Sequence, residues 1–99
     1  MSNRKVVVFA GFKAKAGQES QLEKELLDLI DSTRQEEGCL QYELYRDSSD
    51  PSSFMFHEVW NSRGDLDRHL QTAKLVRLLG LVPELCTEDP MVKLTEKLA

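Results

Sequence analysis

The sequence predicts an α+β fold in which a four-stranded antiparallel sheet carries helices on one of its faces. Four segments alternate apolar and polar positions or are rich in β-branched and aromatic residues, which is typical of strands. Two segments between them repeat apolar residues every three or four positions, which is typical of amphipathic helices. No internal repeat, low-complexity tract or linker interrupts their order, so a single domain over residues 1–99 is expected.

The first strand is predicted over residues 5–15 and should lie inside the sheet. Alternate positions on one face are apolar, namely Val6, Val8, Ala10 and Phe12. The other face carries Val7, Phe9 and Gly11, so both faces of this strand should be covered, as in a central strand.

One amphipathic helix is predicted over residues 18–37. Its apolar stripe consists of Leu22, Leu26, Leu29, Ile30 and Thr33. The charged residues on its other side are interpreted as a solvated face. Gly38 directly follows and is expected to end the helix in a left-handed conformation.

A hairpin is predicted next. Residues 40–47 alternate and should form a strand, with Leu40, Tyr42, Leu44 and Arg46 on one face. The turn-forming residues 47–53 predict a longer loop that leads into an antiparallel strand over residues 54–60.

Glu58 is the one carboxylate in an aromatic row. The strand over residues 54–60 places on one face Phe54, Phe56, Glu58 and Trp60, and on the other Met55, His57 and Val59. Glu58 either reaches water at the sheet edge or lies in a pocket where desolvation raises its pKa and makes it a candidate base. The pattern leaves both possibilities open.

The remaining segments supply a second helical region and an edge strand. Ser62 and Asp65 resemble a capping box that starts a short helix, which should carry Leu66, His69 and Leu70 on one face. Thr72 is predicted to cap a helix over residues 73–82 that stops by Pro83, with the stripe Leu75, Val76, Leu79 and Val82. Residues 84–90 should form a loop, and residues 91–98 a last strand near the sheet edge because of its lysines.

The order strand, helix, strand, strand, helix, strand is that of the split β-α-β, or ferredoxin-like, fold. Its helices cover one face of the sheet, so the other face needs a cover, and a chain of 99 residues has a small core of its own. We therefore expect a homodimer in which two sheets pack face to face. The candidate contacts are Val7, Phe9, Met55 and Val59, and His57 is assigned to the same interface.

The composition excludes several classes of function. The net charge is −4, the pI is about 5.1 and no Lys/Arg cluster stands out, so nucleic acid is not an expected partner. No apolar run approaches the roughly 20 residues of a membrane span. The N-terminus lacks the features of a signal peptide, so we expect no membrane association and a cytoplasmic location. Cys39 and Cys86 lack the spacing of zinc ligands.

Four segments together resemble the antibiotic-biosynthesis monooxygenase (ABM) domain family, including its quinol-monooxygenase-like bacterial members. They are Lys13-Ala-Lys-Ala-Gly17, Glu37-Gly-Cys-Leu-Gln-Tyr-Glu-Leu-Tyr-Arg-Asp47, residues 54–60 and Asp67-Arg-His69-Leu. The resemblance spans nearly the whole chain. It implies a dimeric α/β-barrel assembly and oxidation of phenolic or quinol-type aromatics with O2, without a bound flavin or metal. The family also includes isomerases and haem-degrading relatives, so the resemblance narrows the fold more than the reaction.

Single positions refine what the resemblance implies. Trp60 matches the tryptophan that lines the substrate cavity in characterised monooxygenases. Leu66 and Phe56 stand where an antibiotic-tailoring member has tyrosine and asparagine, so that member's substrate is not expected. His69 agrees with the histidine common in the quinol-oxidising and the uncharacterised members. Haem degradation is not expected, because the positions of that branch's asparagine, tryptophan and histidine hold Ala10, His69 and Leu79.

Oxygenation without a cofactor needs an apolar pocket, an aromatic wall and one base. Trp60 and Phe56 are candidates for the wall, Leu66 is a further candidate for substrate binding, and Tyr42 is a candidate for a hydrogen bond to a substrate oxygen. His69 is the first candidate base because its usual pKa of about 6.5 is close to working pH. Glu58 is the second candidate base, because its carboxyl would act as a base near working pH only if desolvation raised its pKa. No nucleotide-binding loop or His-Glu-x-x-His motif is present, and no cofactor or metal is predicted.

Other interpretations of the same residues stay open. The aromatic residues also suit an ordinary core, His69 a buried position with a backbone partner, and Glu58 an ion pair or a helix-terminus hydrogen bond. The alternative functions are an isomerase or other proton-transfer enzyme acting on a small carbonyl compound, and a non-catalytic dimeric module that binds a small ligand.

Overall fold

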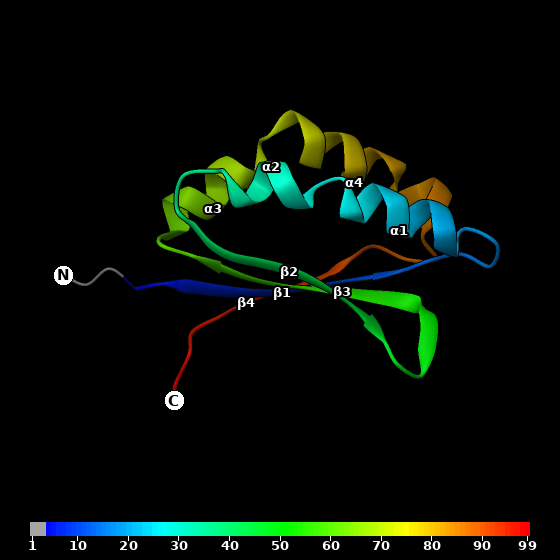
Figure 1. The fold of residues 1–99 in the computed structure, drawn as a ribbon, viewed down its shortest axis with the longest axis horizontal. Coiled ribbons are helices and arrows are strands. Elements are labelled where there is room, and N and C mark those ends of the chain that lie inside the picture. The colour runs from blue at the N-terminus through cyan, green and yellow to red at the C-terminus, as the bar shows by residue number, and fades with distance from the viewer. Residues whose placement is uncertain (1–3) are drawn as a thin grey trace.

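The computed structural model describes residues 4–99 and has all its helices on one side of a single sheet (Figure 1). In chain order the elements are β1 (Val6–Lys13), α1 (Glu19–Leu27), α2 (Ile30–Arg34), β2 (Cys39–Asp47), β3 (Asp50–Trp60), α3 (Arg63–Leu70), α4 (Ala73–Leu85) and β4 (Met91–Thr95). The strand order is β2-β3-β1-β4, and every neighbouring pair is antiparallel. The predicted α+β, ferredoxin-like fold is confirmed.

The core lies between the sheet and the helices. Residues directly opposite each other in antiparallel strands share a face, and Val8, Ala10 and Phe12 of β1 pair with Glu58, Phe56 and Phe54 of β3. All six side chains are buried. The prediction that β1 lies inside the sheet is confirmed, since it pairs with both β3 and β4.

The single helix predicted over residues 18–37 is instead two helices, α1 and α2. The chain tightens between them: the Leu29 N–H donates to the Leu26 carbonyl at 3.2 Å, three residues back instead of four. The predicted stripe still faces the sheet, with Leu22, Leu26, Leu29 and Thr33 buried.

Gly38 follows α2 in the predicted left-handed conformation, with a φ of +82°. A second constraint acts at this position, because a Cβ on Gly38 would lie 2.1 Å from Cγ of Asp65 on α3. The Asn61 N–H also donates to the Gly38 carbonyl at 2.8 Å. Only glycine satisfies both the backbone conformation and the close approach of α3.

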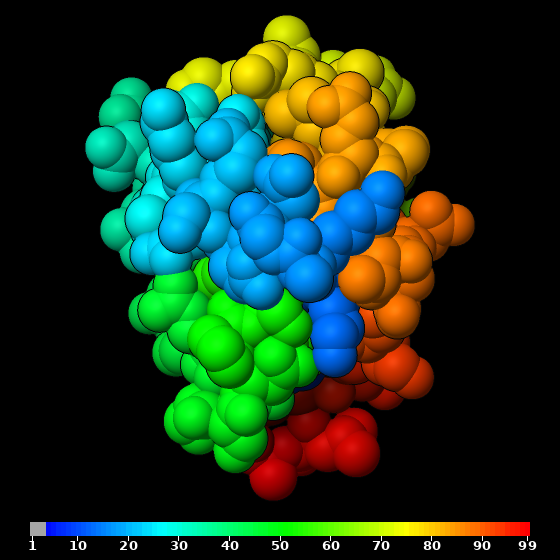
Figure 2. Space-filling model, turned by 90° about the vertical axis from the view of Figure 1, so that its right-hand side faces the viewer, coloured from blue at the N-terminus to red at the C-terminus, as the bar shows by residue number. Residues whose placement is uncertain are grey.

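The predicted longer loop over residues 47–53 is wrong. Asp47 pairs directly with Asp50, so the hairpin turns through Ser48 and Ser49 alone and β3 starts at Asp50. The Asp50 carboxylate accepts from the Ser52 N–H at 3.0 Å and from its hydroxyl at 2.6 Å, which stabilises an extended start despite the turn-forming composition. The space-filling view shows the hairpin and the C-terminal residues below the helix layer (Figure 2).

The alternation predicted Leu40 and Tyr42 on the same face of the strand, and this prediction is wrong for Leu40. The register shifts between Cys39, which pairs with Trp60, and Gln41, which pairs with Val59, so Leu40 is the extra residue of a β-bulge. Its side chain is 52% exposed. The bulge leaves Tyr42 directly opposite Glu58.

The cap of α3 agrees with prediction and the cap of α4 does not. The Asp65 N–H donates to the Ser62 hydroxyl oxygen at 3.2 Å, as expected for an N-cap. Thr72 is at the N-cap position of α4, but its hydroxyl donates to the His69 carbonyl at 2.9 Å. Leu70, predicted on the same face as Leu66 and His69, is exposed, whereas those two residues are buried.

The helix predicted to stop by Pro83 continues to Leu85, into the predicted loop. The Cys86 N–H donates to the Val82 carbonyl at 2.8 Å, so the helical hydrogen bonds resume directly after the proline. The buried stripe of α4 is Leu75, Leu78, Val82 and Leu85, whereas the predicted Val76 and Leu79 are exposed. β4 ends at Thr95 and is an edge strand, as predicted. Among residues 4–99, no helix has the length and apolar character needed to cross a membrane.

Candidate functional site

The six predicted site residues lie together under α3, between that helix and the sheet. The residues are Tyr42 from β2, Phe56, Glu58 and Trp60 from β3, and Leu66 and His69 from α3, and all are buried. We call this group the buried cluster. Phe56, Glu58 and Trp60 share one face of β3 because side chains alternate along a strand. Leu66 and His69, three residues apart on α3, lie on one side of that helix and are buried against the sheet.

Aromatic rings surround His69. Its ring centroid lies 4.7 Å from that of Trp60 at an interplanar angle of 33°, and 5.6 Å from that of Tyr42 at 68°. Tyr42 in turn stacks on Phe56 at 4.8 Å. The sheet therefore presents an aromatic wall in which Trp60 and Tyr42 pack against the imidazole and Phe56 stacks on Tyr42.

Glu58 is buried in this wall. The Trp60 Nε1–H donates to Oε1 of Glu58 at 2.9 Å. Burial raises the pKa of the Glu58 carboxyl to about 7; the indole hydrogen bond opposes this rise, and the negative charge of Glu36 adds to it. Of the two possibilities that the sequence left open, the structure shows desolvation, and this carboxyl exchanges its proton near neutral pH.

His69 has a carboxylate partner that the sequence does not predict. Its Nδ1 lies 3.0 Å from Oε1 of Glu36, in the segment between α2 and β2. Burial lowers the pKa of His69, and the Glu36 carboxylate partly offsets the decrease. The imidazole is therefore neutral at about pH 7, where an unperturbed histidine is already mostly neutral.

The interpretation of the charged side of residues 18–37 as only a solvated face is wrong at Glu36. The stripe of positions 22, 26, 29 and 33 continues to position 36 by a further step of three, which is the signal that could have identified it. Glu25 departs from that interpretation too, because its carboxylate accepts from Arg77 of α4 at 2.6 Å.

Tyr42 has a neighbour within the core. Burial raises the pKa of its phenol, which is therefore un-ionised, and its side chain is hydrogen-bonded with that of Thr33. Thr33 was predicted as a core position and not as a site residue. The cluster thus offers one neutral phenol, one neutral imidazole and one carboxyl that titrates near neutrality.

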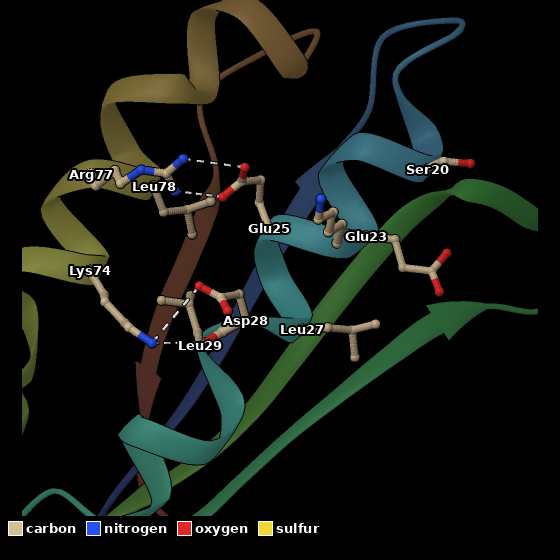
Figure 3. Close-up of a pocket in the computed structure, with 10 residues that line it drawn as sticks. Ser20, Glu23, Glu25, Leu27, Asp28, Leu29, Lys74, Arg77 and Leu78 are labelled. Carbon is tan, nitrogen blue, oxygen red and sulfur yellow. Dashed lines mark hydrogen bonds and ion pairs between the residues drawn. The ribbon is translucent and has the colours of Figure 1, made fainter.

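Two hollows on the surface lie away from the buried cluster. One, of about 920 Å³, lies between α1 and α4 (Figure 3). Two ion pairs lie within it, Arg77 with Glu25 at 2.6 Å and Lys74 with Asp28 at 3.8 Å. The other, of about 830 Å³, lies on the open face of the sheet and is lined by Val7, Phe9, His57 and Val59, among others. None of the six predicted site residues lines either of these two hollows, whereas Tyr42 contributes to a third, smaller hollow of about 330 Å³ beside Arg34 and Glu43.

Comparison of this sequence with known proteins identifies one family to which it is similar. Residues 5–78 match the sequence model of the family described as antibiotic biosynthesis monooxygenase. The uncharacterized protein sll1783 of Synechocystis sp. is 30% identical over 89 residues, which are 90% of this chain and 60% of that protein. The chain thus spans less than two thirds of this relative.

Two crystal structures share the fold over nearly their whole length. PA3566 from Pseudomonas aeruginosa superposes with a TM-score of 0.91 at 30% identity, covering 97% of this chain and 96% of that one. A protein named antibiotic biosynthesis monooxygenase superposes with a TM-score of 0.88 at 32% identity, covering 95% and 99% of the two chains.

Proposed function

Because the chain belongs to the antibiotic biosynthesis monooxygenase family, we propose that it is a monooxygenase that oxidises a quinol or another electron-rich aromatic with O2 and needs no bound cofactor. The observation that carries this proposal is the buried Glu58 carboxyl, whose pKa is raised to about 7 within an aromatic wall. Such a carboxyl can deprotonate a hydroxylated ring near neutral pH, and the surrounding rings suit a planar substrate.

The proposed reaction draws its electrons from the substrate. A base removes a hydroxyl proton, and the resulting anion gives electrons to O2. A carbon–oxygen bond then forms on the ring and the O–O bond breaks, so that the second oxygen atom leaves as water with two hydrogen atoms of the substrate. A quinol and O2 thus give a hydroxyquinone and water.

We assign proton removal to Glu58 and hydrogen bonding of the substrate to His69, which reverses the order of preference predicted from sequence. The lowered pKa of the His69 ring makes it the weaker base, whereas the raised pKa of Glu58 makes its carboxylate a stronger one. Trp60 holds Glu58 in place through the indole hydrogen bond. Phe56, Tyr42 and Leu66 shape the proposed cavity.

Substrate binding requires α3 to move. Leu66 and His69 close the buried cluster from above, and both are carried by this eight-residue helix. The groups assigned to the sheet, Glu58 and Trp60, would stay in place. A shift of α3 away from β3 therefore opens the proposed cavity without disturbing the carboxyl and its indole partner.

The proposed working form is a homodimer that pairs the open faces of two sheets. Within residues 4–99 no helix covers that face (Figure 1), and it carries the predicted contacts Val7, Phe9, Met55 and Val59. Phe9 and Met55 are exposed in the single chain. A second copy would remove this apolar surface from water.

A second candidate function is isomerisation of a small carbonyl compound. The observation that favours it is again Glu58, because a carboxyl that titrates near neutrality can move a proton between carbon atoms without O2. The same site would then interconvert isomers and leave O2 unconsumed.

The test is O2 consumption by the purified, metal-free protein with a panel of quinols and hydroxylated aromatics. The Glu58→Gln and His69→Ala variants are compared with Glu37→Gln, which changes an exposed carboxylate. We expect uptake that is lost in Glu58→Gln, reduced in His69→Ala and kept in Glu37→Gln. No uptake with any compound would overturn the monooxygenase proposal, and substrate conversion without uptake would favour the isomerase.

A further inference from the structure

We propose that Glu36 is a positioning residue, whose carboxylate holds His69 in the tautomer with the proton on Nδ1 and so leaves Nε2 unprotonated, as a hydrogen-bond acceptor. The significance of this role for catalysis rests on the proposed function. The tautomer itself does not, because it follows from the contact between the two side chains.

The contact fixes the position of the proton. Oε1 of Glu36 lies 3.0 Å from Nδ1 of His69, a hydrogen-bonding distance. A carboxylate can only accept, and a neutral imidazole carries one proton, so the proton must be on Nδ1. The lone pair is then on Nε2. The His69 side chain is buried, whereas that of Glu36 is 23% exposed, so the ionised carboxylate keeps access to water.

The backbone around Glu36 is held against α3 by further contacts. The Glu36 N–H donates to the Thr33 carbonyl at 3.0 Å, and its own carbonyl accepts from the Cys39 N–H at 3.1 Å. Gly38, two residues later, packs directly on Asp65 of α3. The two hydrogen bonds define the turn that follows α2, and the approach of Gly38 to Asp65 places this turn beside α3, from which the Glu36 carboxylate reaches His69.

The charge of Glu36 acts on both titrating groups of the buried cluster. It raises the pKa of His69 against the effect of burial, and it also raises the pKa of Glu58. Tyr42 is the third titratable group that packs on His69, and it stays un-ionised. The guanidinium of Arg68, the preceding residue on α3, pairs with Asp65. Glu36 is therefore the one ionised group hydrogen-bonded to His69 among the contacts described for residues 4–99.

Long-range proton–nitrogen NMR spectra of the imidazole test the tautomer directly, with no substrate. Glu36→Ala removes both the acceptor and the charge, whereas Glu36→Gln keeps an amide oxygen as acceptor and removes only the charge. The matched control is Glu37→Ala, because the Glu37 side chain is 85% exposed and belongs to the next residue.

We expect the Nδ1–H tautomer in the unmodified protein, Glu36→Gln and Glu37→Ala, and a shift toward Nε2–H in Glu36→Ala. We also expect the pKa values of His69 and Glu58 to fall in Glu36→Gln and to stay unchanged in Glu37→Ala. A purely structural Glu36 would leave these pKa values unmoved in the glutamine variant. An Nε2–H tautomer in the unmodified protein, or an unchanged tautomer in Glu36→Ala, would overturn the proposal.

Turnover then tests the connection to catalysis. With a substrate found in the O2 assay, Glu36→Ala should lower kcat about tenfold or more, within the range that a positioned acid or base contributes. KM should change little, and Glu36→Gln should recover most of the loss. If the unmodified protein consumes no O2, the proposed function fails while the NMR result still stands. If the unmodified protein consumes O2 and Glu36→Ala has the same kcat, the catalytic positioning role of Glu36 is wrong while the proposed function still stands.

Discussion

Trp60 and Glu58 are hydrogen-bonded to each other inside the core. The indole N–H of Trp60 donates to the Glu58 carboxyl at 2.9 Å, and both side chains are buried. A buried indole needs an acceptor, and a buried carboxyl needs a donor. The two residues are separated by one position on β3, so strand geometry alone places them on the same face. This hydrogen bond keeps a titratable group in an apolar layer, and among residues 4–99 Glu58 forms no ion pair.

Glu58 should make the protein less stable as the pH rises toward neutrality. Its pKa is about 7 in the folded chain against 4.5 for an unperturbed glutamate, so the folded state keeps a proton that the unfolded chain releases between these values. The free energy of unfolding should fall across this window, by up to on the order of 3 kcal/mol, and level off above it.

The measurement is denaturant unfolding at about pH 5 and about pH 8 for the unmodified protein and Glu58→Gln. His69, whose pKa is lowered, contributes a slope of the opposite sign in both proteins, so the difference between them isolates Glu58. In Glu58→Gln the free energy of unfolding should no longer show the decrease that Glu58 causes between these two pH values. Parallel changes in the two proteins would show that Glu58 is not desolvated.

Trp60→Phe should raise the pKa of Glu58 further. The indole hydrogen bond lowers that pKa, and phenylalanine keeps an aromatic ring but offers no donor. The rise in turnover with pH should therefore move to higher pH, and the loss of the hydrogen bond should cost about 1–3 kcal/mol of stability.

The control for Trp60→Phe is Tyr45→Phe, which removes the hydroxyl of an exposed aromatic residue that donates to the Glu43 carboxylate at 2.8 Å. It should change stability by less than about 0.5 kcal/mol. A pH profile of Trp60→Phe that coincides with that of the unmodified protein would mean that the indole does not set the acidity of Glu58.

Gly38→Ala should destabilise the fold more than Gly17→Ala. Both glycines have positive φ, +82° and +87°, so alanine carries a backbone cost of about 1–2 kcal/mol at either position. At Gly17 a Cβ has nothing within 4 Å, whereas at Gly38 it would collide with Asp65. The collision should add a further 1–3 kcal/mol or so. Chemical denaturation of the two variants measures the difference, and equal losses would refute the steric contribution.

The open sheet face should hold two chains together. Sedimentation of the unmodified protein should give a molecular mass of twice the 11.3 kDa of one chain, and the Phe9→Lys variant should have the mass of a monomer. Val76→Lys is the control, because Val76 is also exposed but lies on α4, on the other side of the sheet. A monomeric unmodified protein, or a Phe9→Lys variant that remains dimeric, would exclude this face as the interface.

The elements and their buried faces were largely predictable. The two-residue repeat of β3 was enough to place Phe54, Phe56, Glu58 and Trp60 on one face, because the direction of successive side chains is a local property of a strand. The left-handed Gly38 and the Ser62 cap were predictable for the same reason. The sequence also named the six residues that the fold gathers under α3, while their action on a substrate stays a prediction.

Tertiary structure alone decided the chemistry of these residues. The acidity of Glu58 depends on how completely the helices exclude water from β3, and the partner of His69 comes from Glu36, 33 residues earlier in the chain. The bulge at Leu40 and the continuation of α4 through Pro83 likewise depend on neighbouring segments. Periodicity within one segment determines which way a side chain points, but desolvation and contacts between distant segments exist only once the layers have packed.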